Sequence, residues 1–379
     1  MSERRKILWL VSWYPNKYDS FDGDFIQRHA RAAALYHDIH VLFVKQAAQQ
    51  KNTEETITSG KGLTEQIIYL PKKEWLVGKW SNFRNWRTHY KQQISTIIKN
   101  EKPYLVHVHV PWRAGLMALW AKKKYKISFV ITEHWGIYNR QVEDNIHTRP
   151  FWMRYLLKKI FAEASGFMSV SRYVGEGVKK TVVHRDFVVI PNVVDAALFT
   201  PSENKYKQFT FLHVSNMVPL KNVPGIVDAF TNFQKQTGAD AQLVLVGNDA
   251  NLSSTTRLHS GYNIHFRGEV AYQSVAEEMQ RSHVFVLNSN IENSPCVIGE
   301  AACCGLPVIA TAVGGVPELV NESNGILVPP NDTAALTAAM VQAWQNVHTW
   351  NAASISKEAK QKYAAPSIGE AFARFYATH

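Results

Sequence analysis

The sequence predicts an α/β protein with two doubly wound domains, each built around a mostly parallel sheet. Three observations support this fold class: apolar runs of strand length alternate with helix-like segments, the alternation breaks once at the polar stretch 200–208, and 379 residues exceed one ordinary core. Regular alternation of strand and helix indicates βαβ units, in which helices cover both faces of a parallel sheet. We therefore expect domains at 1–200 and 201–379, facing each other across a cleft at the carboxyl ends of their strands.

Each element of the first half follows from its local pattern. Residues 6–14 (KILWLVSWY) are largely apolar, which suits a strand that is buried on both faces. Apolar residues recur with helical spacing in 24–37 and 113–125. The other strands expected in this half are 39–44, 104–110, 127–134, 166–171 and 187–194.

The same alternation restarts after the polar stretch. Strands are expected at 209–215, 241–247, 262–268, 284–289, 306–311 and 325–330, and helices at 223–236, 272–282 and 295–304. A terminal helical region begins near Ala334. Its last helix either stays with this half or returns to the first.

Composition narrows the class of protein. The chain is 46% hydrophobic and has no run of 18 apolar residues, which is typical of a soluble protein without a transmembrane helix. The basic start is followed by Pro15 and Asn16 with no small-residue cleavage site, which favours a first strand over a signal peptide. Cys296, Cys303 and Cys304 match neither a disulfide framework nor a zinc site, which predicts reduced core residues in a cytoplasmic protein.

The net charge of +11 is unevenly distributed. Residues 1–200 carry 31 Lys and Arg against 17 Asp and Glu, whereas residues 201–379 carry 11 against 14. A basic half beside a slightly acidic half predicts an anionic partner for the first half. Nucleic acid, a phosphorylated small molecule and an anionic membrane surface all fit this charge.

The stretch ENSPCVIGE (292–300) has the features of a ligand site at the start of a helix. Ser294 is suited to the N-cap position and Pro295 to the first helical position. The amides that follow would then lie at the positive end of the helix dipole, where phosphate oxygens bind. These amides belong to Cys296, Val297 and Ile298.

Two carboxylates flank this helix start. Glu292 precedes the helix and Glu300 lies inside it. Beside a phosphate site, carboxylates are favourable where they accept hydrogen bonds from hydroxyl groups, so the pattern suits a molecule with a sugar, a diphosphate and a ribose. The plainer interpretation is a solvated loop residue and a helix-surface charge. Gly314 and Gly315, after the next strand, favour the ligand site because a backbone without Cβ atoms can approach a ligand closely.

Taken together, the motifs of the second half resemble glycosyltransferase family 4, a family of retaining enzymes with the GT-B fold of two Rossmann-like domains. The family's glutamate–seven residues–glutamate motif matches ENSPCVIGEA, and its following segments match GLPVIAT and GGVPELV. Further matches are VIPNVVDAALFTP (189–201), LVLVG (243–247) and Lys221 in HVSNMVPLKNV. The resemblance spans nearly the whole chain and is strongest from 284 to 330.

This resemblance implies roles for individual residues. Glu292 would contact the transferred sugar, Glu300 the ribose hydroxyls, and Lys221 the departing diphosphate. Further donor contacts would come from Asn216, Gly247, Gly268, Pro295, Cys296, Val297 and Ile298. The family usually has an arginine where this chain has Asn216, so neutralisation of the leaving group would be weaker or come from another basic residue.

In the first half, the resemblance points to the ends of three strands. Gly23 lies in the loop YPNKYDSFDGDF, where the family has a glycine beside the donor diphosphate, although a turn alone also accounts for it. His134 in ITEHWG resembles the family's active-site histidine, and His109 is an acceptor-side candidate. Asp22 and Asp24 are interpreted as turn and helix-cap residues and not as metal ligands.

The function implied is transfer of a hexose-type sugar from a UDP- or GDP-linked sugar to a glycan or lipid-linked glycan, with retained configuration, no metal and no cofactor. Basic, aromatic stretches at 71–92 and 149–161 fit peripheral contact with an anionic membrane at the inner face of the cell membrane. Two alternatives stay open. A nucleotide-sugar epimerase has the same architecture, and a nucleic-acid-binding protein fits the charge, although no binding module is recognised.

Overall fold

The computed structural model describes residues 4–74, 78–139, 142, 144–248, 250, 252 and 262–379. The chain divides into two compact units: unit 1 contains Met1–Val193 and Ala365–His379, and unit 2 contains Val194–Ala364. The division falls a few residues ahead of the expected linker, because the Val194 N–H donates to the Tyr363 carbonyl (2.9 Å) inside unit 2.

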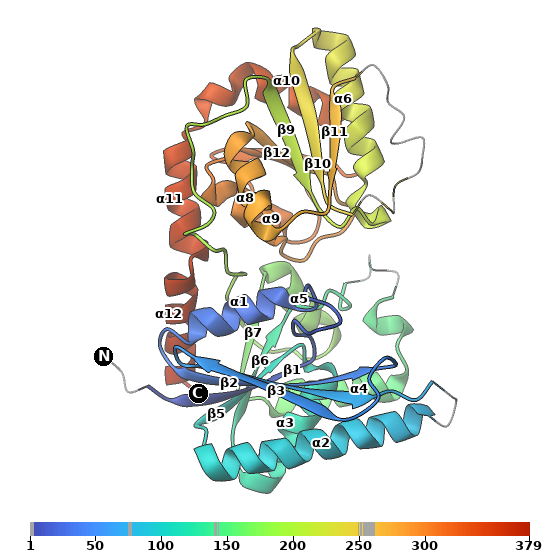
Figure 1. Cartoon of the computed structure of the whole chain (residues 1–379), viewed down its shortest axis with the longest axis vertical. Helices are drawn as coiled ribbons and strands as arrows, with labels where there is room; N and C mark the ends of the chain where they lie inside the picture. The colour runs from blue at the N-terminus through green and yellow to red at the C-terminus, as the bar shows by residue number, and fades with distance from the viewer. Residues whose placement is uncertain are drawn as a thin grey trace. The chain divides into compact units, whose positions relative to one another are not determined.

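Unit 1 contains an eight-stranded sheet with the order β3-β4-β2-β1-β5-β6-β7-β8 (Figure 1). Neighbouring strands are parallel except for the β3–β4 pair, which is antiparallel. The strands are β1 (Lys6–Val11), β2 (Asp38–Ala47), β3 (Glu54–Gly60), β4 (Leu63–Pro71), β5 (Leu105–His109), β6 (Phe129–Glu133), β7 (Gly166–Ser169) and β8 (Val188–Val189).

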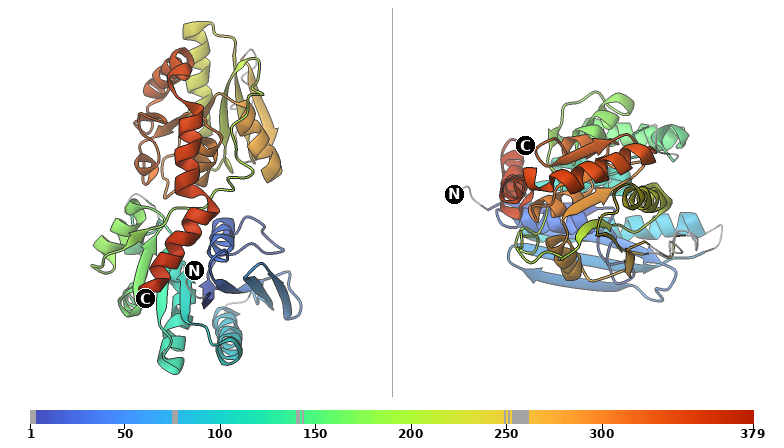
Figure 2. Two further views of the ribbon diagram at one scale, coloured as in Figure 1. Left: turned by 90° about the vertical axis from the view of Figure 1, so that its left-hand side faces the viewer. Right: turned by 90° about the horizontal axis from the view of Figure 1, so that it is seen from above.

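Helices cover both faces of this sheet. They are α1 (Asp24–Ala33), α2 (Gly78–Glu101), α3 (Pro111–Tyr125), α4 (Phe151–Glu163), α5 (Arg172–Thr181) and α12 (Ala365–Ala377), with a short 3-10 turn η1 (Ile146–Thr148). Alternate residues of β1 face opposite layers: Leu8 packs with α2, α3 and α4, whereas Trp9 packs with α1 and α12. The last helix, α12, runs beside α1 (Figures 1 and 2), where Gly369 allows a close approach to the Ala32 carbonyl.

The β3–β4 hairpin is missing from the sequence prediction. Every residue of β3 is exposed, since β3 is an edge strand that pairs only with β4, so it carries no apolar alternation to detect. The hairpin turn at Lys61 and Gly62 has positive φ at both residues. The strand expected at 187–194 is also much shorter than predicted, because Pro191 cannot donate to a ladder.

Unit 2 contains a six-stranded, all-parallel sheet with the order β11-β10-β9-β12-β13-β14. Its strands are β9 (Phe209–Val214), β10 (Ala241–Val246), β11 (Ile264–Gly268), β12 (Val284–Leu287), β13 (Val308–Thr311) and β14 (Gly325–Val328). The predicted α/β fold class, with two parallel-sheet domains, is confirmed.

One face of this sheet packs against α8 (Tyr272–Arg281), α9 (Cys296–Cys303) and α11 (Ala352–Tyr363). The other face packs against α6 (Val223–Thr237) and α10 (Thr333–Asn346), which lie side by side (Figure 1). The described residues of this unit also form the 3-10 turns η2 (Pro219–Lys221), η4 (Val316–Glu318) and η5 (Val347–Thr349). Among the residues described in both units, no helix has the length and apolarity needed to span a bilayer.

Candidate functional site

The carboxyl ends of β9, β12 and β13 carry most of the predicted donor-site residues. β12 lies between β9 and β13, so the loops that follow these three strands are neighbours. The Asn290 N–H donates to the Leu220 carbonyl (2.8 Å), and the Gly315 N–H donates to the Glu292 carbonyl (3.1 Å). These bonds fix the loops after β9 and β13 against the loop after β12.

Glu292 and Lys221 form an ion pair within these loops. Lys221 Nζ lies 2.5 Å from Glu292 Oε1, and Ser289 Oγ donates to the same oxygen at 2.7 Å. Glu292 is buried, at 8% exposure, and the Lys221 side chain is 22% exposed. Because an ammonium carries three donors, Lys221 can hold Glu292 and bind an anion at the same time.

The turn that carries Lys221 has an unusual backbone. Met217 and Asn222, on either side of η2, have φ of 52° and 43°. Ser215 Oγ accepts a bond from the Met217 N–H (3.0 Å) and lies 2.7 Å from His213 Nε2. Burial lowers the pKa of His213 to about 4, so its ring is neutral near pH 7. Sequence reasoning missed this support, although a histidine at a strand end was a usable signal.

Helix α9 begins one residue later than predicted. Pro295 is the N-cap with an extended backbone (ψ 117°), and Cys296 is the first helical residue, so the expectation that Ser294 is the N-cap is wrong. The Ile298 N–H donates to the Pro295 carbonyl (3.3 Å), which removes Ile298 from the amides expected to face a ligand. Cys296 and Val297 supply the first amides of the helix, where the dipole favours an anion.

Glu300 is held by a tyrosine that sequence reasoning missed. It is only 3% exposed, and the Tyr272 hydroxyl donates to its Oε1 at 2.7 Å. Tyr272 begins α8, and its ring lies 5.2 Å from that of Phe199, centroid to centroid. The carboxylate is therefore oriented before any ligand arrives, which suits a role in accepting hydroxyl bonds.

Two glycines meet at the ends of β10 and β11. The Gly247 N–H donates to the Gly268 carbonyl (2.8 Å). Gly247 has φ 135°, and a Cβ there would lie 1.6 Å from the Ser215 carbonyl oxygen, so the chain itself requires glycine at this position. Gly268 has φ 70° with open space around it, and Asn216 follows Ser215 in the adjacent loop. Their contacts with a donor stay predictions.

In unit 1, His109 and His134 form a buried pair. His109 ends β5 and His134 follows β6, and these strands are neighbours. His109 Nδ1 lies 3.0 Å from His134 Nε2, and the ring of Trp9 stacks on His109 at 4.1 Å. Burial, with a smaller effect from nearby histidines, holds the pKa of both rings well below the ordinary value. Two neutral rings each offer one donor and one acceptor, so the pair can orient a hydroxyl.

Glu133 fixes the backbone that carries His134. Its Oε1 accepts the N–H groups of His134 and Trp135, both at 2.8 Å, and its Oε2 accepts the Tyr138 hydroxyl at 2.5 Å. Burial raises the pKa of this carboxyl to about 7, although the hydrogen bonds pull it down. Glu133 is therefore a positioning residue for His134, and the sequence prediction did not include it.

In the loop before α1, the residues predicted to bind a ligand or to shape the turn contact other parts of the protein itself. Gly23 is the N-cap of α1 with φ 69°, and a Cβ there would lie 2.7 Å from the backbone of Trp13. The turn therefore accounts for this glycine, and its predicted approach to a diphosphate stays a prediction. Asp22 accepts a bond from Lys45 Nζ (2.7 Å), and Asp24 is the first residue of α1. Because the N-cap is Gly23 and no side chain caps the start of α1, the predicted helix-cap role of Asp24 is wrong. Asp22 also accepts a bond from Asn16 Nδ2 (3.2 Å) within the loop, which fits a turn residue.

In the described part of the chain, three buried histidines have the geometry to share a metal ion. The ligand atoms of His29, His109 and His134 all lie within 4.8 Å of one another, and neutral imidazole is a common zinc ligand. His109 and His134 here bond each other, and His29 Nε2 lies 2.9 Å from the Pro191 carbonyl oxygen. The sequence prediction names no metal site. These histidines come from three separate segments, so no spacing pattern reveals them.

Comparison with known proteins identifies the family. The model described as Glycosyltransferase Family 4 matches residues 27–198, and the model described as Glycosyl transferases group 1 matches residues 208–346. The putative teichuronic acid biosynthesis glycosyltransferase TuaC of Bacillus subtilis is 23% identical over 91% of this chain and 90% of its own length. The epimerase and nucleic-acid-binding alternatives gain no support from these matches.

Solved structures agree on the fold. Sucrose-phosphate synthase from Thermosynechococcus elongatus superimposes with a TM-score of 0.78 at 19% identity, covering 99% of both chains. Anabaena HepE, solved in complex with UDP and glucose, gives a TM-score of 0.72 at 17% identity, covering 99% of this chain and all of that one. With a GT-B fold and two matching family models that together span most of its length, the chain belongs to the group 1 glycosyltransferases of the family 4 type.

Proposed function

We propose that the protein moves a hexose-type sugar from a UDP- or GDP-linked donor to a glycan or lipid-linked glycan, with retained anomeric configuration, in surface polysaccharide or glycoconjugate biosynthesis. The observation that carries this proposal is the Lys221–Glu292 pair, which lies just before α9 in loops fixed to one another. The name of the Bacillus relative, in teichuronic acid biosynthesis, supports a glycan product. The UDP and glucose bound by HepE support a nucleotide-sugar donor.

Unit 2 offers each part of a nucleotide sugar a complementary group. Lys221 and the positive end of α9 would neutralise the diphosphate as it leaves, which stabilises charge that develops in the transition state. Glu300, oriented by Tyr272, would accept the ribose hydroxyls. The ammonium and the helix amides supply the positive charge that a divalent ion gives other transferases, so the proposed reaction is metal-independent.

Retention would follow from attack on the face that the diphosphate leaves. Glu292 would stabilise positive charge on the sugar ring as an oxocarbenium-like state forms, and we assign it no covalent bond to the sugar. His134, neutral and backed by His109, would hold a sugar hydroxyl. His109 would then lie on the acceptor side.

Contact of unit 1 with an anionic membrane is part of the proposal and would place the enzyme at the inner face of the cell membrane. Over the first nine residues of α4, the exposed side chains are aromatic or basic: Phe151, Trp152, Arg154, Tyr155, Lys158 and Lys159. The helix ends with exposed Ala162 and with Glu163, whose charge is paired with Lys122 at 2.8 Å. Of the three tryptophans in 71–92, Trp80 is exposed, Trp86 is buried, and Trp75 lies outside the described residues.

The membrane proposal predicts sedimentation with phosphatidylglycerol vesicles at low salt, release at high salt, and no sedimentation with phosphatidylcholine alone. Substitution of Phe151 and Trp152 by serine should weaken the association. Equal recovery in the supernatant with and without anionic vesicles would refute membrane contact and leave the transferase proposal standing.

The transferase proposal is tested by thermal unfolding with UDP, GDP, ADP and their sugars. A nucleotide at about 100 times its Kd should stabilise unit 2 by roughly 2.7 kcal/mol, which raises the Tm by about 5–10 °C. The Glu300→Ala variant should lose most of this shift, whereas Glu322→Ala, at an exposed position of the same unit, should keep it. No shift with any nucleotide would contradict the proposal. Turnover of a nucleotide sugar without an acceptor would indicate an epimerase.

A further inference from the structure

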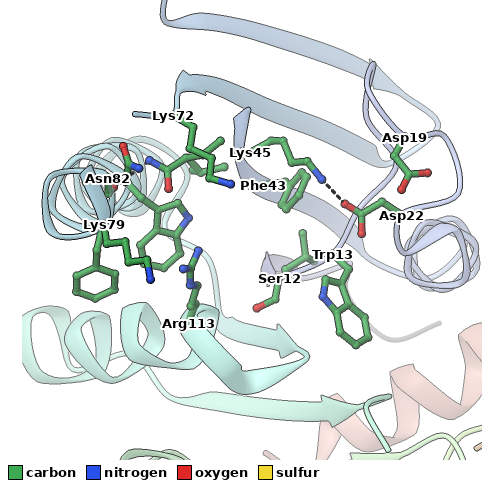
Figure 3. Close-up of a pocket in the computed structure, with 15 residues that line it drawn as sticks. Ser12, Trp13, Asp19, Asp22, Phe43, Lys45, Lys72, Lys79, Asn82 and Arg113 are labelled. Atoms are coloured by element: carbon green, nitrogen blue, oxygen red, sulfur yellow. Dashed lines mark hydrogen bonds and ion pairs between the residues drawn. The ribbon is translucent and has the colours of Figure 1, made fainter. Parts of the chain in front are cut away.

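A polar cavity lies entirely within unit 1. It has a volume of about 680 Å³ and is lined by four cations, two carboxylates and four aromatic side chains (Figure 3). Val11 ends β1, Lys72 follows β4, and Arg113 follows β5, so the cavity opens at the carboxyl edge of the sheet. His109 ends a strand at this same edge, and its carbonyl accepts the Ser12 N–H at 3.2 Å.

Three of the four cations have no acidic partner among the described residues. Lys45 pairs with Asp22 at 2.7 Å, whereas no ion pair is formed by Lys72, Lys79 or Arg113 in the described part of the chain. Figure 3 shows these three side chains turned toward one space, across from Asp19 and Asp22. Unpaired like charges that converge repel each other, so this half of the cavity is complementary to an anion.

The backbone that presents Arg113 is strained. Val110 and Arg113 have φ of 56° and 69°, and positive φ is rare for a β-branched residue such as Val110. Ser12 Oγ lies 2.7 Å from the Val110 carbonyl oxygen and 2.5 Å from that of Trp112, which holds the segment in place. Strain of this kind clusters at ligand sites, because a relaxed turn would aim the side chain elsewhere.

The rest of the lining suits a sugar. The aromatic side chains of Trp13, Phe43, Phe83 and Trp86 form apolar walls, and Asp19 and Asp22 provide hydroxyl acceptors on the side away from the free cations. A ligand that spans the cavity would therefore place an anionic group near Lys72, Lys79 and Arg113 and its hydroxyls near the two carboxylates.

We propose that this cavity binds the phosphate or diphosphate of a phosphorylated sugar acceptor. The inference rests on the proposed function, since it assigns the acceptor class of the same enzyme. Tetrahedral phosphate oxygens accept several charge-assisted hydrogen bonds at once, which a Lys–Lys–Arg set provides. The phosphate comes either from a soluble sugar phosphate or from the diphosphate head of a lipid carrier, and the chemistry recognised is the same.

Calorimetric titration of the full chain, with any nucleotide that binds unit 2 present at saturation, tests this assignment. The probes are glucose 1-phosphate, farnesyl diphosphate in detergent, and methyl α-glucoside as the uncharged control. Lys72→Gln and Lys79→Gln should each weaken binding of the charged probes about tenfold, the effect of losing one charge-assisted bond. Lys99→Gln removes the same charge from the exposed far end of α2 and should change the Kd less than twofold.

The outcomes separate the inference from the proposed function. Tighter binding of farnesyl diphosphate than of glucose 1-phosphate, lost in the two cavity variants, supports a lipid-linked acceptor, and the reverse order supports a soluble one. Binding of neither charged probe, or equal losses in Lys79→Gln and Lys99→Gln, overturns the assignment. Nucleotide binding measured on the same samples stays intact in that case, because the donor site lies in unit 2. Loss of nucleotide binding with retained anion binding would instead refute the donor proposal.

Discussion

Replacing Glu133 by glutamine should change how the stability of unit 1 depends on pH. Glutamine keeps the shape of the side chain and its carbonyl oxygen can still accept the N–H groups of His134 and Trp135, but it cannot ionise. Any difference in pH dependence between the variant and the wild type therefore reports the titration of this one carboxyl.

The magnitude follows from the raised pKa of Glu133. The pKa is about 7 in the folded protein against an ordinary 4.5. The folded state thus binds the proton more tightly than the unfolded state, and stability falls as pH rises between these values. The stabilisation is fully present below pH 4.5 and lost above pH 7. At 1.36 kcal/mol for each tenfold in proton affinity, the total is roughly 3 kcal/mol, of which about 2.5 kcal/mol is lost between pH 5 and pH 8.

Urea unfolding at pH 5, 6, 7 and 8, followed by tryptophan fluorescence, measures this effect. Of the eleven tryptophans, all except Trp344 and Trp350 lie in unit 1, so the signal reports mainly that unit. Buried histidines such as His29, whose pKa burial lowers to about 4, gain stability as pH rises and oppose the trend in the wild type. The histidines contribute equally to both proteins, so their effect cancels in the difference between the free energies of unfolding of the variant and the wild type. This difference should rise by about 2.5 kcal/mol in favour of the variant from pH 5 to pH 8.

A matched control removes a carboxyl that is not buried. Glu74 is exposed, and Glu74→Gln should shift stability by only a few tenths of a kcal/mol at every pH. If Glu133→Gln followed the wild-type curve in parallel across the whole range, then the carboxyl of Glu133 would titrate normally. Burial would then not set the protonation state of this carboxyl.

Three further perturbations have defined outcomes. Glu292→Gln should lower kcat for sugar transfer about 100-fold, because the ion pair with Lys221 is lost. The nucleotide affinity should stay within about threefold, because the ribose contacts remain. An unchanged kcat would show that Glu292 takes no part in the reaction. Gly247→Ala should destabilise unit 2 by about 3 kcal/mol or more in urea unfolding, because its Cβ would overlap the Ser215 carbonyl, and a change below about 1 kcal/mol would contradict that packing. A thiol reagent at pH 8 should label Cys296 in the native protein, and Cys303 and Cys304 only after unfolding. Burial raises the pKa of the latter two thiols to about 12. Equal labelling rates for all three cysteines would show that unit 2 unfolds locally and exposes the buried pair.

Much of the fold could be predicted because the spacing of apolar residues along the sequence indicates most of the strands and helices. The apolar run 6–14 contains β1, and its alternate residues Leu8 and Trp9 contact opposite helix layers, as a strand in a parallel sheet requires. The antiparallel β3 escaped prediction because its exposed residues carry no such pattern, and its stability comes from pairing with β4. An edge strand of this kind is specified by its neighbour and not by its own sequence.

The candidate site likewise contains residues that the sequence predicted and residues that it did not. Glu292, Glu300 and Lys221 were predicted from motifs, and two of them form the ion pair of unit 2. The residues that hold the site were not predicted. Tyr272 reaches Glu300 from the start of another helix, and Glu133, which holds the backbone of His134, looks in the sequence like any acidic residue at the end of a strand. Such contacts depend on which segments the sheet order brings together, and that order is not encoded at fixed spacing.

The placement of the basic residues in unit 1 distinguishes between partners that the composition alone does not. The excess of positive charge in residues 1–200 fits nucleic acid, a membrane or a phosphorylated small molecule equally well. A nucleic-acid groove would spread its cations along a stripe that follows a phosphate backbone. Lys72, Lys79 and Arg113 instead converge on a cavity of about 680 Å³ with carboxylates on its other side, which is the size and polarity of a site for one small ligand. A diffuse basic surface would not require the strained turn at Arg113, because it binds without a fixed geometry.

For these three cations, the structure therefore favours a phosphorylated small molecule as the partner. A membrane would instead contact the aromatic and basic residues of α4.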